Sequence, residues 1–111
     1  MNGLPCHYEG VYDEARLTSE VRIDLFRICQ ECLLNASNHA QASHVKVSVK
    51  DLGNRIQLVV VDDGKGFDVE QGRRKPGFIR MRERAASING ELTIESRAGE
   101  GTMVCVSIAK L

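Results

Sequence analysis

The amino-acid sequence predicts a two-layer α/β sandwich of the α+β type, in which helices cover one face of a mixed, mostly antiparallel sheet. Three observations lead to this class. One long segment repeats its apolar residues at helical spacing, several short segments alternate apolar and polar residues, and the elements follow the order β-α-β-β-loop-α-β-β. With 111 residues, of which 42% are apolar, the chain is expected to form one domain over residues 1–111.

The long helical segment is predicted to begin at Thr18 or Ser19 and to end near His39. Either hydroxyl can cap a helix, and Glu20 suits the positive end of the helix dipole. The apolar residues that follow recur on one side of a helix, and they are Val21, Leu25, Ile28, Cys29, Cys32, Leu33 and Ala36. This stripe predicts the side of the helix that packs on the sheet.

Five short segments have the pattern of strands. Residues 5–9 are expected to form an edge strand, and residues 45–50 and 56–61 are expected to pair as a hairpin across a Gly-Asn turn. Residues 92–94 and 104–108 flank a glycine-rich turn and predict a second hairpin. Two hairpins and an edge strand account for the mixed sheet.

The segment between the two hairpins is predicted to contain a loop and a second helix. Residues 68–77 are polar, basic and without apolar periodicity, so a mobile loop is expected there. A helix is predicted over residues 79–88, with Gly90 in the left-handed position after its end. Its expected inner face consists of Ile79, Met81, Ala85 and Ile88.

Charge and cysteine content narrow the possible functions. Fifteen basic and fifteen acidic residues cancel, so no overall field favours nucleic acid, and any phosphate has to be held locally. No apolar run approaches 18 residues and no signal peptide is evident, so a cytoplasmic domain is expected, whether or not its parent protein is membrane-anchored. Cys29 and Cys32 have metal-site spacing, but one turn apart on the apolar stripe they are interpreted as small buried hydrophobes.

Three motifs carry polar groups that a core does not need. Glu31, Asn35 and His39 form a row at the edge of the long helix, and on spacing alone this row is more typical of a solvated helix edge than of a site. Asp62 ends an aliphatic strand and is followed by Asp63 and by two glycines, an arrangement able to accept a hydrogen bond from the amino group of adenine. The alternative for this motif is an ordinary glycine-rich turn.

The third motif is Gly99-Glu100-Gly101-Thr102. It predicts a tight hairpin turn, and its small residues also leave room for a phosphate or ribose, with the Thr102 hydroxyl as a donor. None of the three motifs is specific by itself, and their order along the chain is the stronger signal.

Taken together, the motifs resemble those of sensor histidine kinases in the nitrate-sensor and DesK-like group. The segment QECLLNASNHA, residues 30–40, resembles the N box, and DDGKGF, residues 62–67, resembles the first glycine box. MRERA at 81–85 resembles the stretch after the second glycine box, and GEGT at 99–102 resembles the last box. The resemblance implies the Bergerat ATP-binding fold of the superfamily that includes gyrase, the MutL repair proteins and a heat-shock chaperone.

The resemblance assigns roles to individual residues. It implies that ATP and Mg²⁺ are bound, that Asn35 is the metal ligand, and that Glu31 lies beside metal and phosphates as a catalytic residue. It implies that Asp62 binds the adenine amino group. The remaining nucleotide-binding residues implied by the resemblance are Asn38, His39, Gly64, Gly66, Gly77, Ile79, Met81, Gly101 and Thr102. Residues 68–77 are implied to be the lid over the nucleotide.

The lid departs from the family pattern. The family has Gly-x-Gly-Leu-x-Gly before the Met-Arg-Glu-Arg, whereas this chain has Lys75, Gly77 and Arg80 at the three glycine positions. Glycines there let backbone N–H groups wrap the phosphates, so the change concerns the phosphate half of the site. The two new residues are cationic, which still favours phosphate, and Pro76 stiffens the turn.

The leading interpretation is the ATP-binding catalytic domain of a two-component histidine kinase. It transfers the γ-phosphate to a histidine on a separate dimerisation domain, is inactive without that domain, and feeds a response regulator; alone it is expected to be monomeric. One alternative is a non-catalytic interaction module of the same fold with an impaired lid. Another is a relative that phosphorylates serine on an anti-sigma partner, against which the Met81 to Ala85 stretch argues.

Overall fold

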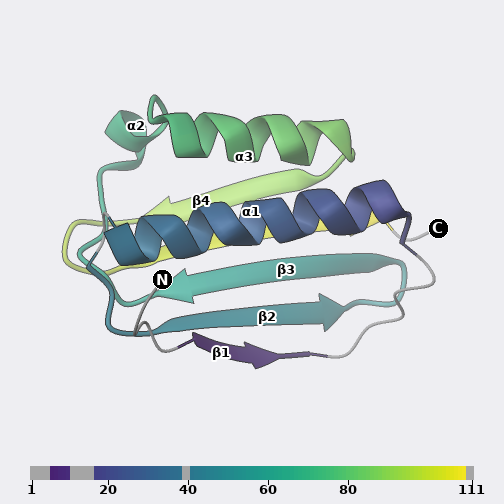
Figure 1. The fold of residues 1–111 in the computed structure, drawn as a ribbon, viewed down its shortest axis with the longest axis horizontal. Helices are drawn as coiled ribbons and strands as arrows, with labels where there is room; N and C mark the ends of the chain where they lie inside the picture. The colour runs from purple at the N-terminus through teal and green to yellow at the C-terminus, as the bar shows by residue number, and fades with distance from the viewer. Residues whose placement is uncertain (1–5, 11–16, 39–40, 110–111) are drawn as a thin grey trace.

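A computed structural model describes residues 6–10, 17–38 and 41–109 and contains a single five-stranded sheet with helices on one face (Figure 1). The strand order is β1-β2-β3-β5-β4; β1 is parallel to β2, and every other pair is antiparallel. The elements are β1 Cys6–Glu9, α1 Ser19–Asn38, β2 Val45–Asp51, β3 Arg55–Asp62, α2 Val69–Gly72, α3 Pro76–Ser87, β4 Glu91–Ser96 and β5 Thr102–Ala109. The predicted α+β sandwich, with both hairpins and the edge strand, is confirmed.

Helix α1 lies across the middle of the sheet, as its sequence predicted. Thr18 caps it, because its Oγ1 accepts the backbone N–H of Val21 at 3.2 Å. The predicted apolar stripe faces inward, and Ile28, Cys32 and Ala36 are 0%, 5% and 0% exposed. Packing of this stripe on the sheet fixes the direction in which the polar residues beside it point.

The two central strands provide the floor on which α1 and α3 pack. Alternate side chains of β3 and β5 point to the helical layer, which is the period-2 pattern of a half-covered sheet. These buried residues are Ile56, Leu58, Val60, Val104, Val106 and Ile108. The same alternation places Asp62 on the inner face two residues after Val60, opposite Thr102 in the β3–β5 register.

The region between the hairpins differs from the prediction. The expected loop at 68–77 contains a short helix, α2, and α3 begins at Pro76 rather than at residue 79. Proline is favoured in the first helical turn because its missing N–H would have no partner there. Pro76 therefore starts the helix.

The inner face of α3 also differs from the prediction. Ile79 is 39% exposed, whereas Phe78, Met81 and Ala85 are buried, so Phe78 takes the inward place that had been expected for Ile79. The left-handed residue after the helix is Asn89, with φ 54°, and Gly90 donates its N–H to the carbonyl of Ala85 at 2.8 Å. Asparagine tolerates this conformation better than most residues.

Within the described residues, no helix has both the length and the apolar character needed to cross a bilayer. Cys32 is buried and its thiol donates to the Met81 sulfur at 3.7 Å, and burial raises the pKa of that thiol. This agrees with the interpretation of Cys32 as a small core hydrophobe.

Candidate functional site

A cavity of about 250 Å³ lies between the ends of the central strands, α1 and the beginning of α3. Its walls are largely apolar and a few polar groups converge on it, which is the usual composition of a small-molecule site. The lining residues are Cys32, Asn35, Val60, Asp62, Lys65, Gly66, Phe67, Lys75, Phe78, Thr102 and Val104. Four of these residues come from the central strands. Val60 and Asp62 are two residues apart on β3, and Thr102 and Val104 are two residues apart on β5, so each pair points to the same face of the sheet.

Asp62 is a hydrogen-bond acceptor in the wall of this cavity. The residue is 9% exposed, and its Oδ1 accepts the backbone N–H of Gly64 at 2.8 Å. Burial raises the pKa of Asp62, and the Gly64 hydrogen bond opposes that rise. A carboxylate fixed in this way has acceptor capacity left for a further donor, which the expected adenine recognition requires.

The neighbouring aspartate, Asp63, makes hydrogen bonds to the chain before β2. Asp63 Oδ1 accepts the backbone N–H groups of Ser43 and His44 at 2.7 and 2.9 Å, and its other oxygen lies 3.4 Å from the His44 ring. These bonds hold the start of β2 against the end of β3. Asp63 is therefore a structural residue, and Asp62 alone of the pair lines the cavity.

Two phenylalanines form one wall of the cavity. The rings of Phe67 and Phe78 lie 4.8 Å apart, and the Lys75 Nζ lies 5.9 Å from the Phe67 ring centre. Ser96 fixes this wall to the strand ends, because its Oγ accepts the Phe67 N–H at 3.0 Å and lies 2.9 Å from the Thr102 hydroxyl. The cavity thus combines an aromatic surface with the cation of Lys75, a residue of the predicted lid.

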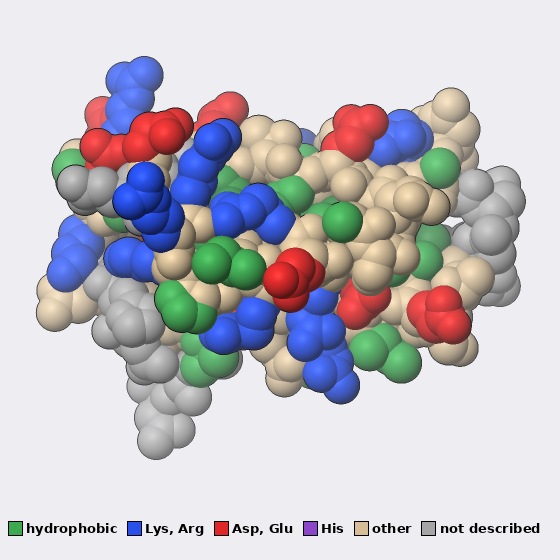
Figure 2. All heavy atoms as spheres, turned by 90° about the horizontal axis from the view of Figure 1, so that it is seen from above, with side chains coloured by type: hydrophobic (Ala, Val, Ile, Leu, Met, Phe, Trp, Pro, Cys, Tyr) green, Lys and Arg blue, Asp and Glu red, His purple; other side chains and the backbone are tan. Residues whose placement is uncertain are grey.

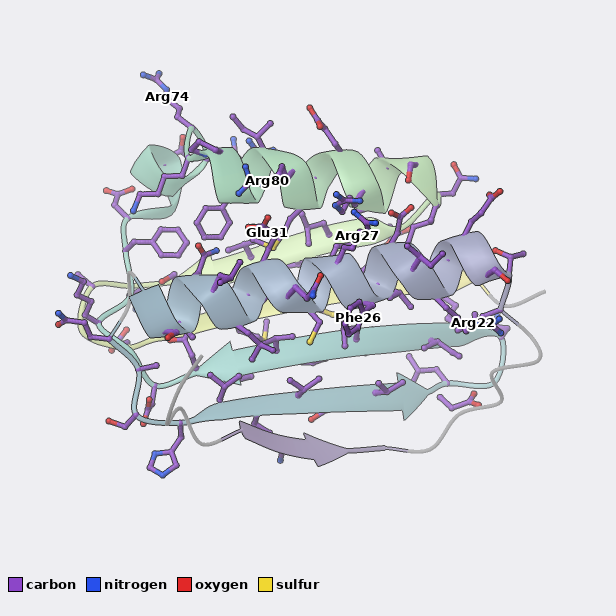
Figure 3. All side chains as sticks on the ribbon, in the orientation of Figure 1. Arg22, Phe26, Arg27, Glu31, Arg74 and Arg80 are labelled. Atoms are coloured by element: carbon purple, nitrogen blue, oxygen red, sulfur yellow. The ribbon has the colours of Figure 1, made fainter. Side chains whose placement is uncertain are left out.

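The phosphate end predicted from the sequence lies where α1 faces the first turn of α3. A Cβ placed on Gly77 would lie 3.1 Å from Glu31 Oε2 and 3.5 Å from Asn35 Oδ1, so a larger residue there would require the Glu31 carboxylate to move by a few tenths of an ångström. Arg80 on α3 and Glu31 on α1 point toward each other, and Arg74 projects away into solvent (Figure 3). The Arg80 Nε donates to Glu31 Oε1 at 2.7 Å, and its Nη2 donates to Oε2 at 3.2 Å.

Asn35 belongs to both parts of the site. It lines the cavity, and its amide faces Gly77. Its buried Nδ2 has no hydrogen-bond partner among the residues that the structure describes. A buried amide without a partner costs about 1–3 kcal/mol, so this group is suited to a bound ligand.

The remaining predicted site residues are distributed unevenly. Gly66 and Thr102 line the cavity, while Gly64 and Gly101 contact Asp62 through their backbones. Ile79 and Met81 do not line it, because Ile79 points outward and Met81 is fully buried beneath. His39 and the side chain of Asn38 lie outside the part of the chain that the structure describes.

Sequence reasoning missed Phe67, Phe78, Lys65 and Lys75 as site residues, together with the supporting Ser96. Phe67 directly follows the glycines that were singled out, and its position beside them was the available signal. Phe78 lies between the predicted lid, 68–77, and the predicted helix, 79–88, and was given no inward position because the helix start at Pro76 was not recognised. No local pattern marks Ser96, which acts only through hydrogen bonds made across the fold.

The oxygen donors near Gly77 can be compared with what the implied Mg²⁺ requires. No cluster of three or more histidine, cysteine, aspartate or glutamate side chains with metal-binding geometry occurs in the described ranges. Mg²⁺ usually takes one or two protein oxygens and completes its shell with water and substrate phosphates. The side-chain amide of Asn35 and the adjacent carboxylate of Glu31 fit that pattern.

Comparison with known proteins gives the family. The family described as histidine kinase-, DNA gyrase B-, and HSP90-like ATPase matches residues 20–111. The chain belongs to this family. Among curated relatives, it is 38% identical over 107 residues to the signal transduction histidine-protein kinase/phosphatase DegS of Brevibacillus brevis, covering 96% of this chain and 28% of DegS. UhpB of Salmonella typhimurium, a protein with the same kinase/phosphatase description, is 38% identical over 106 residues, which cover 96% of this chain and 21% of UhpB.

Solved structures of histidine kinases show the same fold. A blue-light activated histidine kinase of Erythrobacter litoralis EL346 superposes with a TM-score of 0.82 at 19% identity, covering 98% of this chain and 36% of that one. The ATP binding domain of PrrB from Mycobacterium tuberculosis gives a TM-score of 0.75 at 15% identity, covering 100% and 83%. The expected ATPase-domain fold of two-component histidine kinases is thus confirmed, and the chain spans less than a third of the curated relatives above.

Proposed function

We propose that this chain binds Mg-ATP in the cavity around Asp62 and acts as the catalytic module of a two-component histidine kinase. The observation that carries the proposal is the pairing of a buried acceptor, Asp62, with the unpartnered amide of Asn35 across one apolar cavity. Family membership and the relatives named above support the same activity.

In this proposal the chain contributes binding and positioning. Asp62 accepts the adenine amino group, Phe67 and Phe78 pack near the base, and Lys65 and Lys75 add positive charge at the rim. Asn35 would hold the metal, with Glu31 beside it, and Mg²⁺ bound there would supply positive charge that offsets the charge of the phosphates.

The acceptor of the γ-phosphate is proposed to be a histidine on the dimerisation domain of the parent protein, and a response regulator then receives the phosphoryl group. Residues 68–77, with α2, are proposed to be the lid. The chain needs this acceptor domain for turnover, so a mixture of the two with radiolabelled ATP tests the transfer itself.

Calorimetric titration with a non-hydrolysable ATP analogue, with and without Mg²⁺, tests the binding step. Metal-dependent binding is expected, and absence of binding at millimolar nucleotide contradicts the proposal. Asp62→Asn replaces one acceptor oxygen by a donor facing another donor, so affinity is expected to fall by about tenfold or more. The matched control is Asp63→Asn, which alters the adjacent carboxylate outside the cavity and should leave affinity unchanged.

Stability measurements separate a binding role of Asp62 from a structural one. The Asp62→Asn side chain keeps an oxygen for the Gly64 N–H, so its melting temperature is expected within a few degrees of the parent chain. An unfolded Asp62→Asn variant shows instead that this carboxylate is structural.

One observation favours the second candidate, a non-catalytic module of the same fold. Glu31, the predicted catalytic residue, is held by Arg80 in two hydrogen bonds. If the chain binds the ATP analogue but transfers no phosphate to the acceptor domain, this second candidate replaces kinase activity.

A further inference from the structure

Among the described residues, two ion pairs join α1 to α3, and one of these two lies at the candidate site. Arg84 Nη1 lies 3.3 Å from Asp24 Oδ1, near the end of α3. One helical turn earlier, Arg80 donates two hydrogen bonds to Glu31. The two arginines bridge the same pair of helices, but the Arg80 pair is next to Gly77 and Asn35.

The Glu31 carboxylate occupies a place that suits an anion. It is 15% exposed and lies against the first turn of α3, where backbone N–H groups point outward from a helix end. The first turn of α3 contains no acidic residue, and Lys75 at its N-cap makes no side-chain cap, within the described chain. Glu31 is therefore a carboxylate that Arg80 holds close to this end of the helix.

Arg80 is accessible to a competing anion. Its side chain is 50% exposed. The hydrogen bond and the charge of Glu31 raise the pKa of Arg80, so its guanidinium stays charged. Figure 2 shows several Lys and Arg side chains over the half of the surface that contains α2 and the beginning of α3. The exposed ones include Arg73, Arg74 and Lys75. An anion with more charge than a carboxylate is attracted to the same place.

A guanidinium forms the same two-pronged pair with a phosphate as with a carboxylate. Asn35 lines the cavity and also lies beside Gly77 and Glu31, which pairs with Arg80. A chain of phosphates that leaves the cavity past Asn35 therefore approaches Arg80. We propose that Arg80 is a phosphate-binding residue, which Glu31 holds in reserve and which gives the site its preference for adenosine di- and triphosphate over adenosine. This inference rests on the proposed function of the same cavity.

The test compares adenosine, ADP and a non-hydrolysable ATP analogue by calorimetry on the full 111-residue chain, with EDTA present so that no divalent cation contributes. Arg80→Gln removes the charge and the fork but keeps a polar side chain. It is expected to weaken ADP and the ATP analogue by about tenfold and to leave adenosine within about twofold. Arg80→Lys restores charge without the fork and is expected to recover part of the loss.

A second pair of variants tests the role of Glu31. Glu31→Gln removes the competing negative charge and is expected to tighten the ATP analogue by several-fold in EDTA. The same change made on top of Arg80→Gln is expected to have no such effect, because the residue that Glu31 restrains is gone. A gain that persists without Arg80 contradicts the proposal.

Arg84→Gln is the matched control, since it breaks the other ion pair between α1 and α3 far from the cavity. Equal losses in Arg80→Gln and Arg84→Gln overturn the proposal, because helix packing then explains both. Tighter binding of the ATP analogue by Arg80→Gln overturns it as well, since Arg80 is then an obstruction. Equal binding of adenosine and the analogue by the unaltered chain in EDTA, or binding of the analogue that appears only when Mg²⁺ is restored, refutes the role of Arg80 alone. Absence of analogue binding even with Mg²⁺ restored refutes the proposed function too.

Discussion

Replacing Gly101 by alanine is expected to destabilise the domain and displace the acceptor of the candidate site. Gly101 has a φ of 80°, and a Cβ at this residue would lie 2.3 Å from the backbone oxygen of Asp62. The positive φ costs alanine about 1 kcal/mol, and relieving the overlap by moving β5 costs about 2 kcal/mol more. The expected sum is about 3 kcal/mol, or a melting temperature lower by roughly 12 °C for a domain of this size.

Gly99 offers a control with the same backbone and different surroundings. Its φ is 83°, but a Cβ there would have no heavy atom within 4 Å in the described structure. Gly99→Ala is therefore expected to lose only about 1 kcal/mol and to bind nucleotide unchanged. Urea unfolding followed by circular dichroism measures both variants, and calorimetry measures binding. Equal destabilisation of the two variants, or full nucleotide affinity in Gly101→Ala, refutes the reasoning about close packing at Asp62.

Two further predictions concern the core and the acid range. Met81→Ala is expected to lower the free energy of unfolding by about 3 kcal/mol, because Met81 is fully buried against Cys32. Met103→Ala, at a partly exposed residue of β5, should lower it by less than about 1 kcal/mol. Similar losses for the two variants in chemical denaturation contradict this packing. Hydrogen bonds from the backbone N–H groups of His44 and Ser43 hold the pKa of Asp63 below its usual value, so its stabilisation is present above the unfolded-state pKa of about 3.9 and is lost as pH falls through the folded-state pKa. Asp63→Asn should flatten the dependence of unfolding free energy on pH in that range, and an unchanged slope would argue against the role of these bonds.

The sequence predicted those parts of the fold whose cause is local. The stripe from Val21 to Ala36 and the alternation in β3 and β5 are repeated many times along the chain, so single exceptions do not hide them. The beginning of α3 depended on one residue, Pro76, which was interpreted as a stiff turn although proline is also common at a helix start. Counting from Ile79 instead of Pro76 then assigned the wrong residue to the inner face.

As with the fold, the parts of the site that could be predicted are those with a local signal in the sequence. Asp62, Thr102 and Asn35 follow from motifs, since each lies at a fixed offset from a recognisable element. The pairing of Glu31 with Arg80 joins residues 49 positions apart, and no local pattern records it. Long-range contacts of this kind depend on how two helices pack, which the sequence of neither helix specifies by itself.

Cys32 lines the cavity and also touches Met81, which is fully buried in the core. The floor of the cavity is therefore part of the interior that keeps the domain folded, and ligand occupancy and folding are linked equilibria. A ligand at one hundred times its dissociation constant adds about 2.7 kcal/mol to the free energy of unfolding. Each variant of the site thus changes two quantities at once, its own stability and the additional stability that nucleotide confers, and a melting curve with and without ligand separates them.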